Sequence, residues 1–128
     1  MEVYDPQADS WQRVASMPQG LYAHAAAVMG GRIYVTGGSR EEHYGDPEML
    51  VCMYDPQADA WTQLASMSTS RRSHASAVVG GKLYVFGGFH SDEYQDLSTV
   101  EVYDPTSNSW AQGLSLTSVR SCIVAIAL

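Results

Sequence analysis

Histidines beside carboxylates are the groups of this sequence that come nearest to a catalytic or metal-binding set. His43 follows Glu41 and Glu42, and His90 lies two residues before Asp92. Imidazole and carboxylate groups bind metal ions such as zinc, but neither segment has a fixed ligand spacing. We therefore expect two solvated loops, no metal site and no cofactor.

A nucleophile needs an activating base in a defined arrangement, and the sequence contains no such motif. It has no Gly-x-Ser-x-Gly segment and no repeated carboxylate pair. Cys52 and Cys122 have no Cys-x-x-Cys partner, so we interpret both as buried free thiols. We expect no catalytic residue and no enzymatic activity.

Composition and charge restrict the class of partner. Of the 128 residues, 45% are apolar and 16% are charged, which is typical of a folded domain. The formal net charge of -7 would repel nucleic acid. The start has no signal-like pattern, and the final apolar run, 123–128, is too short to cross a bilayer. We expect a soluble cytoplasmic protein with no membrane partner, and the cytoskeleton and nucleus are alternative locations.

A ten-residue pattern recurs three times, as EVYDPQADSW, CMYDPQADAW and EVYDPTSNSW, and the copies are 50 and then 49 residues apart. In each copy a tyrosine precedes a tryptophan by seven residues, giving the pairs Tyr4 and Trp11, Tyr54 and Trp61, and Tyr103 and Trp110. His24 and His74 are also 50 residues apart, which favours repeated packing residues over metal ligands. A period of this length indicates structural units stacked on one another.

Each unit is predicted to contain four short β-strands. A Gly-Gly doublet between two apolar runs indicates a tight hairpin, because both central residues of the favoured turn need positive φ. Tyr-Asp-Pro ends the third strand in a turn, and the fourth strand carries the tryptophan. The first strands are expected at 24–28 and 74–79, and the second strands at 32–36 and 82–86.

Four short antiparallel strands that are apolar on both faces need a neighbour on each face. Radial stacking of such sheets gives a β-propeller. We predict an all-β fold, an incomplete propeller with four-stranded antiparallel blades. The expected units are a partial blade with third and fourth strands (1–17), two full blades (18–67 and 68–116), and the first strand of a further blade (117–128, with the strand at 121–127).

The second full unit resembles the kelch repeat. The matching residues are Arg71, His74, Leu83, Tyr84, Gly87, Gly88, Val100, Glu101, Tyr103, Asp104, Pro105 and Trp110. The resemblance spans nearly the whole chain, with departures at Leu21, which replaces the arginine, and at Ile123, which replaces the histidine. It implies that the glycine doublets allow a neighbouring aromatic ring to approach. The recurrence of the tryptophans at one strand position indicates that every tryptophan fills a gap between blades. The repeat residues with a structural role are therefore Gly37, Gly38, Tyr54, Trp61, Gly87, Gly88, Tyr103 and Trp110.

The dense Tyr-Asp-Pro units look most like the propellers of BTB-kelch proteins. That resemblance implies a protein-binding module that captures a substrate for a cullin-3 ubiquitin ligase. Cullin-3 itself is expected to bind only through BTB and helical domains that these 128 residues do not contain. The alternatives are a cytoskeletal, actin-associated or scaffold kelch protein, and a kelch-fold enzyme or sugar binder.

The two long loops between second and third strands, 39–47 and 89–96, break the repeat and are suited to recognition. In similar propellers these loops and the turns before the first strands form the partner face. The candidate partner-binding residues are Tyr22, Arg40, His43, Tyr44, Arg71, Arg72, His90, Asp92 and Tyr94. Arg71 also fits the repeat and is an alternative brace between blades, so Arg72 is the better recognition residue.

The predicted units are too few to close into a ring. Two full blades leave apolar blade faces and sheet edges uncovered, and such surfaces invite association. Repeat proteins also depend on neighbour contacts and protected ends for stability. We therefore expect that the chain does not form a closed, stable monomeric propeller, and we interpret it as a fragment or shortened isoform with an incomplete binding face. The alternatives are completion by the missing blades of a longer parent chain, and self-association through the uncovered blade faces into a dimer with composite blades.

Overall fold

The computed structural model describes residues 1–42, 45–91 and 94–127, and it contains twelve β-strands and no helix in this part of the chain. The strands are β1 (Glu2–Asp5), β2 (Ser10–Arg13), β3 (Ala25–Met29), β4 (Arg32–Thr36), β5 (Val51–Asp55), β6 (Ala60–Gln63), β7 (Ala75–Val79), β8 (Lys82–Phe86), β9 (Phe89–His90), β10 (Gln95–Asp96), β11 (Val100–Asp104) and β12 (Ser109–Gln112). The all-β prediction is confirmed. The described residues hold no helix that could serve as a membrane span.

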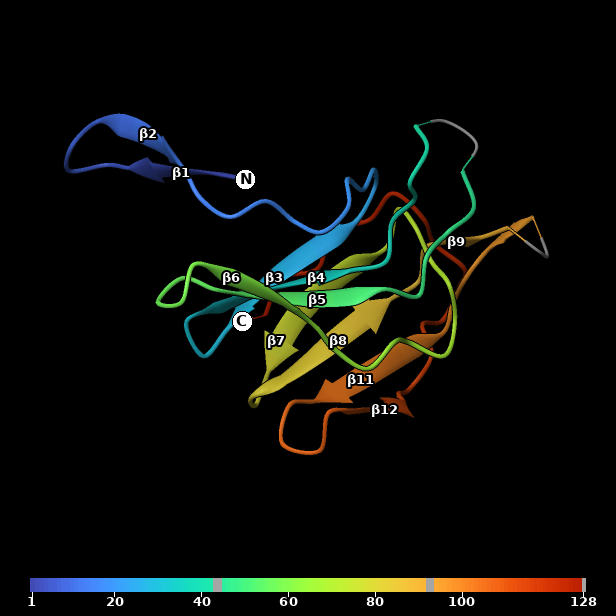
Figure 1. Ribbon diagram of the computed structural model, residues 1–128. Coiled ribbons are helices and arrows are strands. Elements are labelled where there is room, and N and C mark those ends of the chain that lie inside the picture. The colour runs from blue at the N-terminus through green and yellow to red at the C-terminus, as the bar shows by residue number, and fades with distance from the viewer. Residues whose placement is uncertain (43–44, 92–93, 128) are drawn as a thin grey trace.

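Two four-stranded antiparallel sheets make up the body of the molecule, with the orders β3-β4-β5-β6 and β7-β8-β11-β12. Strands β3 and β7 contact each other across the two sheets. The β1-β2 hairpin projects from this body, and β9 and β10 form a small hairpin in the loop after β8 (Figure 1). This arrangement is that of two propeller blades side by side, although the boundaries predicted for the units stay predictions.

The two kinds of glycine doublet meet different physical needs. Gly30 and Gly31, in the turn between β3 and β4, have φ of 58° and 75°, and apart from the adjacent residues no atom lies within 4 Å of where a Cβ would stand. Backbone conformation alone requires glycine there. At Gly37, a Cβ would collide with the carbonyl oxygen of Arg71 and the ring of His74. The second doublet therefore lets the start of the next unit approach closely.

The core lies between the two sheets. One cluster joins Met29 and Tyr34 of the first sheet to Leu83 and Tyr103 of the second. A second cluster consists of Val51, Met67 and Val85, with Leu64 and Trp110 packed against it. Each sheet is thus the cover for the other, as stacked blades require.

The end of the chain differs from the prediction. The strand expected at 121–127 is absent. Arg120, just before this segment, nevertheless has the same backbone contact as Arg71, its equivalent in the preceding repeat. The Gly88 amide donates to the Arg120 carbonyl (2.8 Å), just as Gly38 donates to Arg71 (2.9 Å). A strand needs a partner for its backbone groups, and none of the described strands pairs with this segment. For the same reason Cys122 is exposed, contrary to the expected burial, whereas Cys52 is buried.

Candidate functional site

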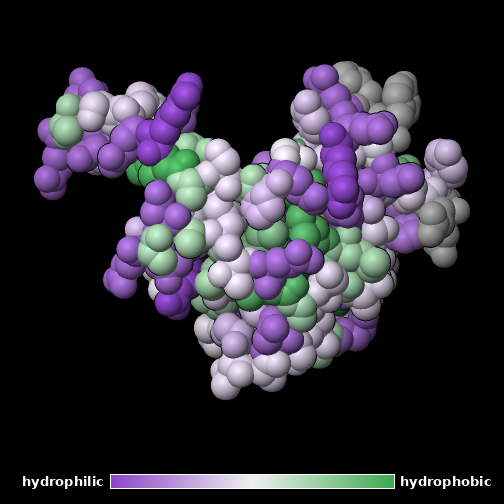
Figure 2. Space-filling model, in the orientation of Figure 1, coloured by the Kyte–Doolittle hydropathy of each residue, from purple (hydrophilic) through white to green (hydrophobic). Residues whose placement is uncertain are grey.

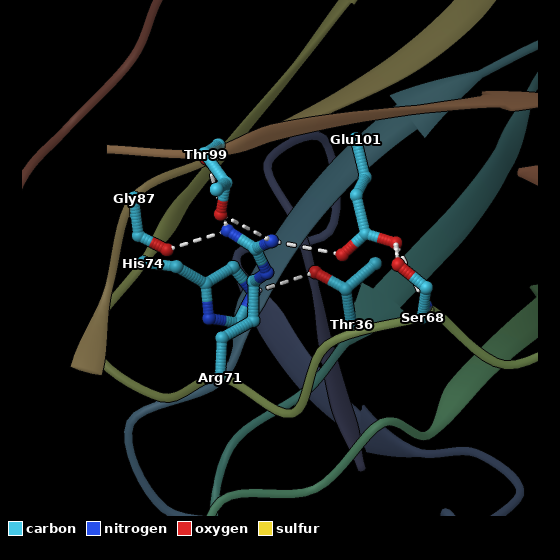
Figure 3. A network of polar contacts seen from close by, with 7 residues as sticks. All are labelled: Thr36, Ser68, Arg71, His74, Gly87, Thr99 and Glu101. Atoms are coloured by element: carbon cyan, nitrogen blue, oxygen red, sulfur yellow. Dashed lines mark hydrogen bonds and ion pairs between the residues drawn. The ribbon is translucent and has the colours of Figure 1, made fainter. Parts of the chain in front are cut away.

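A buried polar network lies beneath the loops, centred on Arg71 (Figure 3). The Arg71 side chain is fully buried, and its Nη2 donates to Glu101 Oε2 at 2.8 Å. Its Nη1 donates to the carbonyl of Gly87 at 2.7 Å, and both terminal nitrogens contact Thr99. The second oxygen of Glu101 accepts from the backbone and hydroxyl of Ser68, at 2.7 and 2.6 Å.

This network connects elements that are distant in the sequence. Arg71 and Ser68 lie in the segment between the sheets, whereas Gly87 follows β8 and Glu101 belongs to β11. Burial lowers the pKa of the Arg71 guanidinium, and the neighbouring Glu101 opposes that effect. A guanidinium stays charged in proteins, so the carboxylate is needed to compensate it. The expectation that Arg71 contacts a partner is wrong, because its side chain is out of reach, and the bracing alternative describes it.

His74 is also a packing residue. Its Nε2 lies 2.8 Å from Thr36 Oγ1, and both side chains are buried between the sheets (Figure 3). Burial, assisted by the charge of Arg71, lowers the pKa of His74 to about 3, so the imidazole is neutral near pH 7. His24, its repeat equivalent, is exposed and contacts the Leu21 carbonyl through Nδ1 at 3.0 Å.

The exposed loop face has a row of aromatic and cationic groups. The Arg72 guanidinium lies 4.8 Å from the centre of the Phe89 ring. The Phe89 ring meets the Tyr94 ring edge to face, and Tyr94 is 88% exposed. Backbone pairing between Arg72 and Phe89 holds this row in place. Sequence reasoning selected Arg72 and Tyr94 but missed Phe89, whose position directly after a glycine doublet was the available signal.

An open depression of about 260 Å³ adjoins this row, with Arg72 and Tyr22 in its wall. The remaining lining residues are Ala23, Ser39, Glu41 and Glu42. The structure therefore brings together two candidates from separate units, Tyr22 and Arg72. It also adds two carboxylates that sequence reasoning had considered only as metal ligands.

The other loop candidates lie apart from this depression. Arg40 lines a neighbouring hollow of about 220 Å³ and forms an ion pair with Glu48 at 2.6 Å. His90 lines a third hollow, of about 330 Å³, beside Ser68 and Thr99. Figure 2 shows that the surface at the loop end, upper right, is mainly hydrophilic. Three candidates, His43, Tyr44 and Asp92, fall outside the described residues.

The repeated tryptophans hold one unit to the next. Trp61 Nε1 donates to the Ala15 carbonyl at 3.0 Å, and Trp110 Nε1 donates to the Ala65 carbonyl at 2.8 Å. Both rings are partly buried. Trp11 does not follow them, because 69% of its surface is exposed. The expectation that every tryptophan fills a gap between blades is wrong for Trp11, whose ring packs beside Tyr4 and is otherwise largely exposed.

No three His, Cys, Asp or Glu side chains among the described residues are grouped so as to hold a metal ion. The described part of the loop face consists instead of open hollows with aromatic, arginine and carboxylate groups beside the two sheets. Such a surface can form hydrogen bonds, ion pairs and apolar contacts with a macromolecule.

Comparisons with known proteins agree with this architecture. The family described as "KLHDC2/KLHL20/DRC7 Kelch-repeats domain" matches residues 1–121. Kelch-like protein 15 of Danio rerio is 48% identical over 46 residues, which are 35% of this chain and 8% of that protein. Kelch-like protein 33 of Homo sapiens is 40% identical over 38 residues, 30% of this chain and 7% of that protein. The matches thus span less than a tenth of either relative. Because the family match covers nearly all of its length, this chain belongs to the kelch-repeat family.

Proposed function

We propose that this chain is a protein-binding kelch module and that its loop face takes part in capturing a protein substrate. The observation that carries the proposal is the placement of Arg72 on Phe89 beside the depression that Tyr22 shares. Arginine and tyrosine are enriched among the residues that dominate binding energy at protein interfaces. A cation held over an aromatic ring is also ordered before binding, which lowers the entropic cost of the contact.

The charges around the depression give the partner an orientation. Glu41 and Glu42 contribute to its lining together with Arg72. A partner segment with one basic and one acidic side chain could place the basic group beside the two glutamates and the acidic group beside Arg72. Rim charges of this kind affect the association rate and the choice of partner more than the affinity.

The similarity to kelch-like proteins supports a more specific role, that of substrate recognition for a cullin-3 ubiquitin ligase. In this proposal cullin-3 binds through other domains of an adaptor, and the repeats described above supply only the substrate contact. The module has no catalytic activity of its own and acts in the cytoplasm.

Affinity purification with matched variants tests the binding face. We expect the unmodified chain to retain a set of proteins that Arg72→Ala and Tyr22→Ala lose, with affinities at least about tenfold weaker. Arg13→Ala, at a side chain that is 92% exposed on β2, is the control and should retain them all. Identical retention by all four proteins would contradict the loop face as the binding surface.

The cullin-3 role needs a second measurement. If the retained proteins are substrates, their abundance in cells should rise when cullin-3 is depleted. If the retained proteins bind but their abundance does not rise, the adaptor role is contradicted and a scaffold function is favoured.

A further inference from the structure

A hollow of about 330 Å³ opens between the segment that precedes β7 and the loop that follows β8. Its lining residues are Ser68, Thr69, His90, Leu97 and Thr99, and all of them belong to the interior of the sequence. A space of this volume is at the small end of the range for ligand pockets in proteins. It therefore suits a small group, such as one side chain of a partner.

This hollow lies on the opposite side of β9 from the cationic row at Arg72. Phe89 and His90 are consecutive residues of β9, and consecutive side chains of a strand point to opposite faces. The Phe89 ring carries the Arg72 guanidinium, whereas the His90 ring lines the hollow. A partner that lies across the hairpin of β9 and β10 therefore reaches both places.

The buried network beneath the hollow determines what the Thr99 hydroxyl offers. Thr99 Oγ1 lies 3.2 Å from Arg71 Nη2 (Figure 3). A guanidinium has only donors, so the threonine oxygen accepts in this contact and keeps its own hydrogen. Thr99 thus supplies a hydrogen-bond donor to the hollow.

The same network determines the role of Ser68. Its hydroxyl lies 2.6 Å from Glu101 Oε1. A carboxylate has only acceptors, so the serine donates its hydrogen to Glu101 and keeps its lone pairs. Ser68 and Thr99 therefore give the hollow one acceptor and one donor, and the ion pair between Arg71 and Glu101 sets both roles.

His90 contributes a buried polar atom that needs a partner. The side chain as a whole is half-buried, and its Nδ1 atom is closed off from solvent. That atom has no hydrogen-bond partner among the described residues. Buried polar atoms in proteins nearly always have one, so Nδ1 indicates that the hollow receives a hydrogen-bonding group.

The hollow carries no net charge. Among the described residues, its lining contains no carboxylate, lysine or arginine, and the ion pair beneath it is compensated. The depression beside Arg72 differs, because Glu41 and Glu42 line it. A charged group that entered the hollow would lose hydration without gaining a counter-charge, which is more costly than burying a hydrogen-bonded neutral group. The matching occupant is therefore uncharged and has a donor and an acceptor close together.

We infer that this hollow, which we call the amide site, binds the carboxamide group of an asparagine or glutamine side chain. The amide oxygen accepts from the Thr99 hydroxyl, and the NH₂ group donates to Ser68 Oγ and to His90 Nδ1. Leu97, which is 9% exposed, is the apolar wall for the methylene part of the side chain. The inference rests on the proposed function, since a protein partner supplies the amide.

NMR titration with three small probes tests the chemistry of the amide site without a partner protein. Acetamide, acetate and acetamidinium have nearly the same shape but are neutral, negative and positive. At about pH 8, acetamide should shift the His90 ring resonances saturably at roughly millimolar concentration, and the two ions should bind at least about tenfold more weakly. The ring of His24 does not line the hollow and is the internal control. Acetate or acetamidinium binding as tightly as acetamide would overturn the assignment of an amide, and no shift with any probe would overturn the site.

Variants of the lining residues test the assigned contacts. Thr99→Val keeps the shape of the side chain but removes the donor, so it should weaken acetamide binding about fivefold, whereas Thr99→Ser should bind normally. Because Thr99 also contacts Arg71, circular dichroism checks that both variants are folded. His90→Leu lies outside the network and should also weaken binding about fivefold, measured by the backbone amide resonance of Leu97. Unchanged binding in folded His90→Leu would overturn the inference.

Arg72→Ala separates this inference from the proposed function. Arg72 does not line the amide site, so this variant should bind acetamide as the unmodified chain does, although it should lose captured proteins. Loss of acetamide binding in folded Arg72→Ala would overturn the separate amide site. If Arg72→Ala retains every captured protein, the proposed binding face is contradicted, while the acetamide titration still decides the amide site.

Discussion

Replacing Glu101 with glutamine tests whether the buried network holds the two sheets in place. The substitution preserves the size of the side chain but leaves the Arg71 guanidinium without a compensating charge in a position with no solvent exposure. Removing one partner of a buried ion pair typically costs about 3 to 5 kcal/mol of folding free energy. We expect a loss in that range, because five hydrogen-bonding groups around the pair, from Ser68, Gly87 and Thr99, are placed for the charged form.

The first full unit supplies a compensating variant. It has Leu21 and Cys52 at the positions of Arg71 and Glu101 and still forms a complete four-stranded sheet. Arg71→Leu alone leaves a buried carboxylate and should be as harmful as Glu101→Gln. The double variant Arg71→Leu with Glu101→Cys removes both charges, so we expect it to recover at least about 2 kcal/mol relative to the summed single variants.

Urea denaturation followed by tryptophan fluorescence and circular dichroism measures these free energies, provided that both signals give one transition. Arg40→Gln is the control, since its ion pair with Glu48 is exposed on the arginine side and should contribute less than about 1 kcal/mol. A double variant that costs the full sum of the two single variants would refute the compensation. A Glu101→Gln protein as stable as the Arg40→Gln protein would refute the role of the network.

Three further predictions use the same denaturation assay. Because burial lowers the pKa of His74 to about 3, the unfolded chain takes up the proton first as pH falls, and stability should drop by roughly 2 kcal/mol between pH 7 and pH 5. His74→Gln should flatten that pH profile, and an unchanged slope would contradict the assignment. Trp61→Ala should cost about 3 kcal/mol and Trp11→Ala under about 1 kcal/mol in dilute solution, and equal costs would contradict the contact with Ala15. Gly37→Ala should be several-fold more harmful than Gly30→Ala, which costs about 1 kcal/mol from φ alone, and equal costs would contradict the close approach of Arg71 to Gly37.

Local chemistry made much of the fold predictable. The turn between β3 and β4 depends on Gly30 and Gly31, whose positive φ is a property of the residues themselves. The recurrence of Tyr-Asp-Pro and tryptophan with one period predicted strands, turns and stacked sheets, because each unit repeats the same local preferences. The proposed binding face was predictable only as loop segments, and within it the sequence indicated Tyr22 and Arg72 as candidates.

Burial at a repeated position was decided by the tertiary structure. Arg71 and Arg72 are adjacent, and the sequence left open whether Arg71 braces the blades or contacts a partner. The fold places Arg71 against Glu101 with no exposure and Arg72 over Phe89. His24 and His74 share one repeat position, but His74 lies buried against Thr36 of the other sheet, whereas His24 is exposed. A repeat pattern describes what each unit contributes to an interface. The packing between units decides which of these side chains become buried, and burial in turn sets the exposure and the pKa of each side chain.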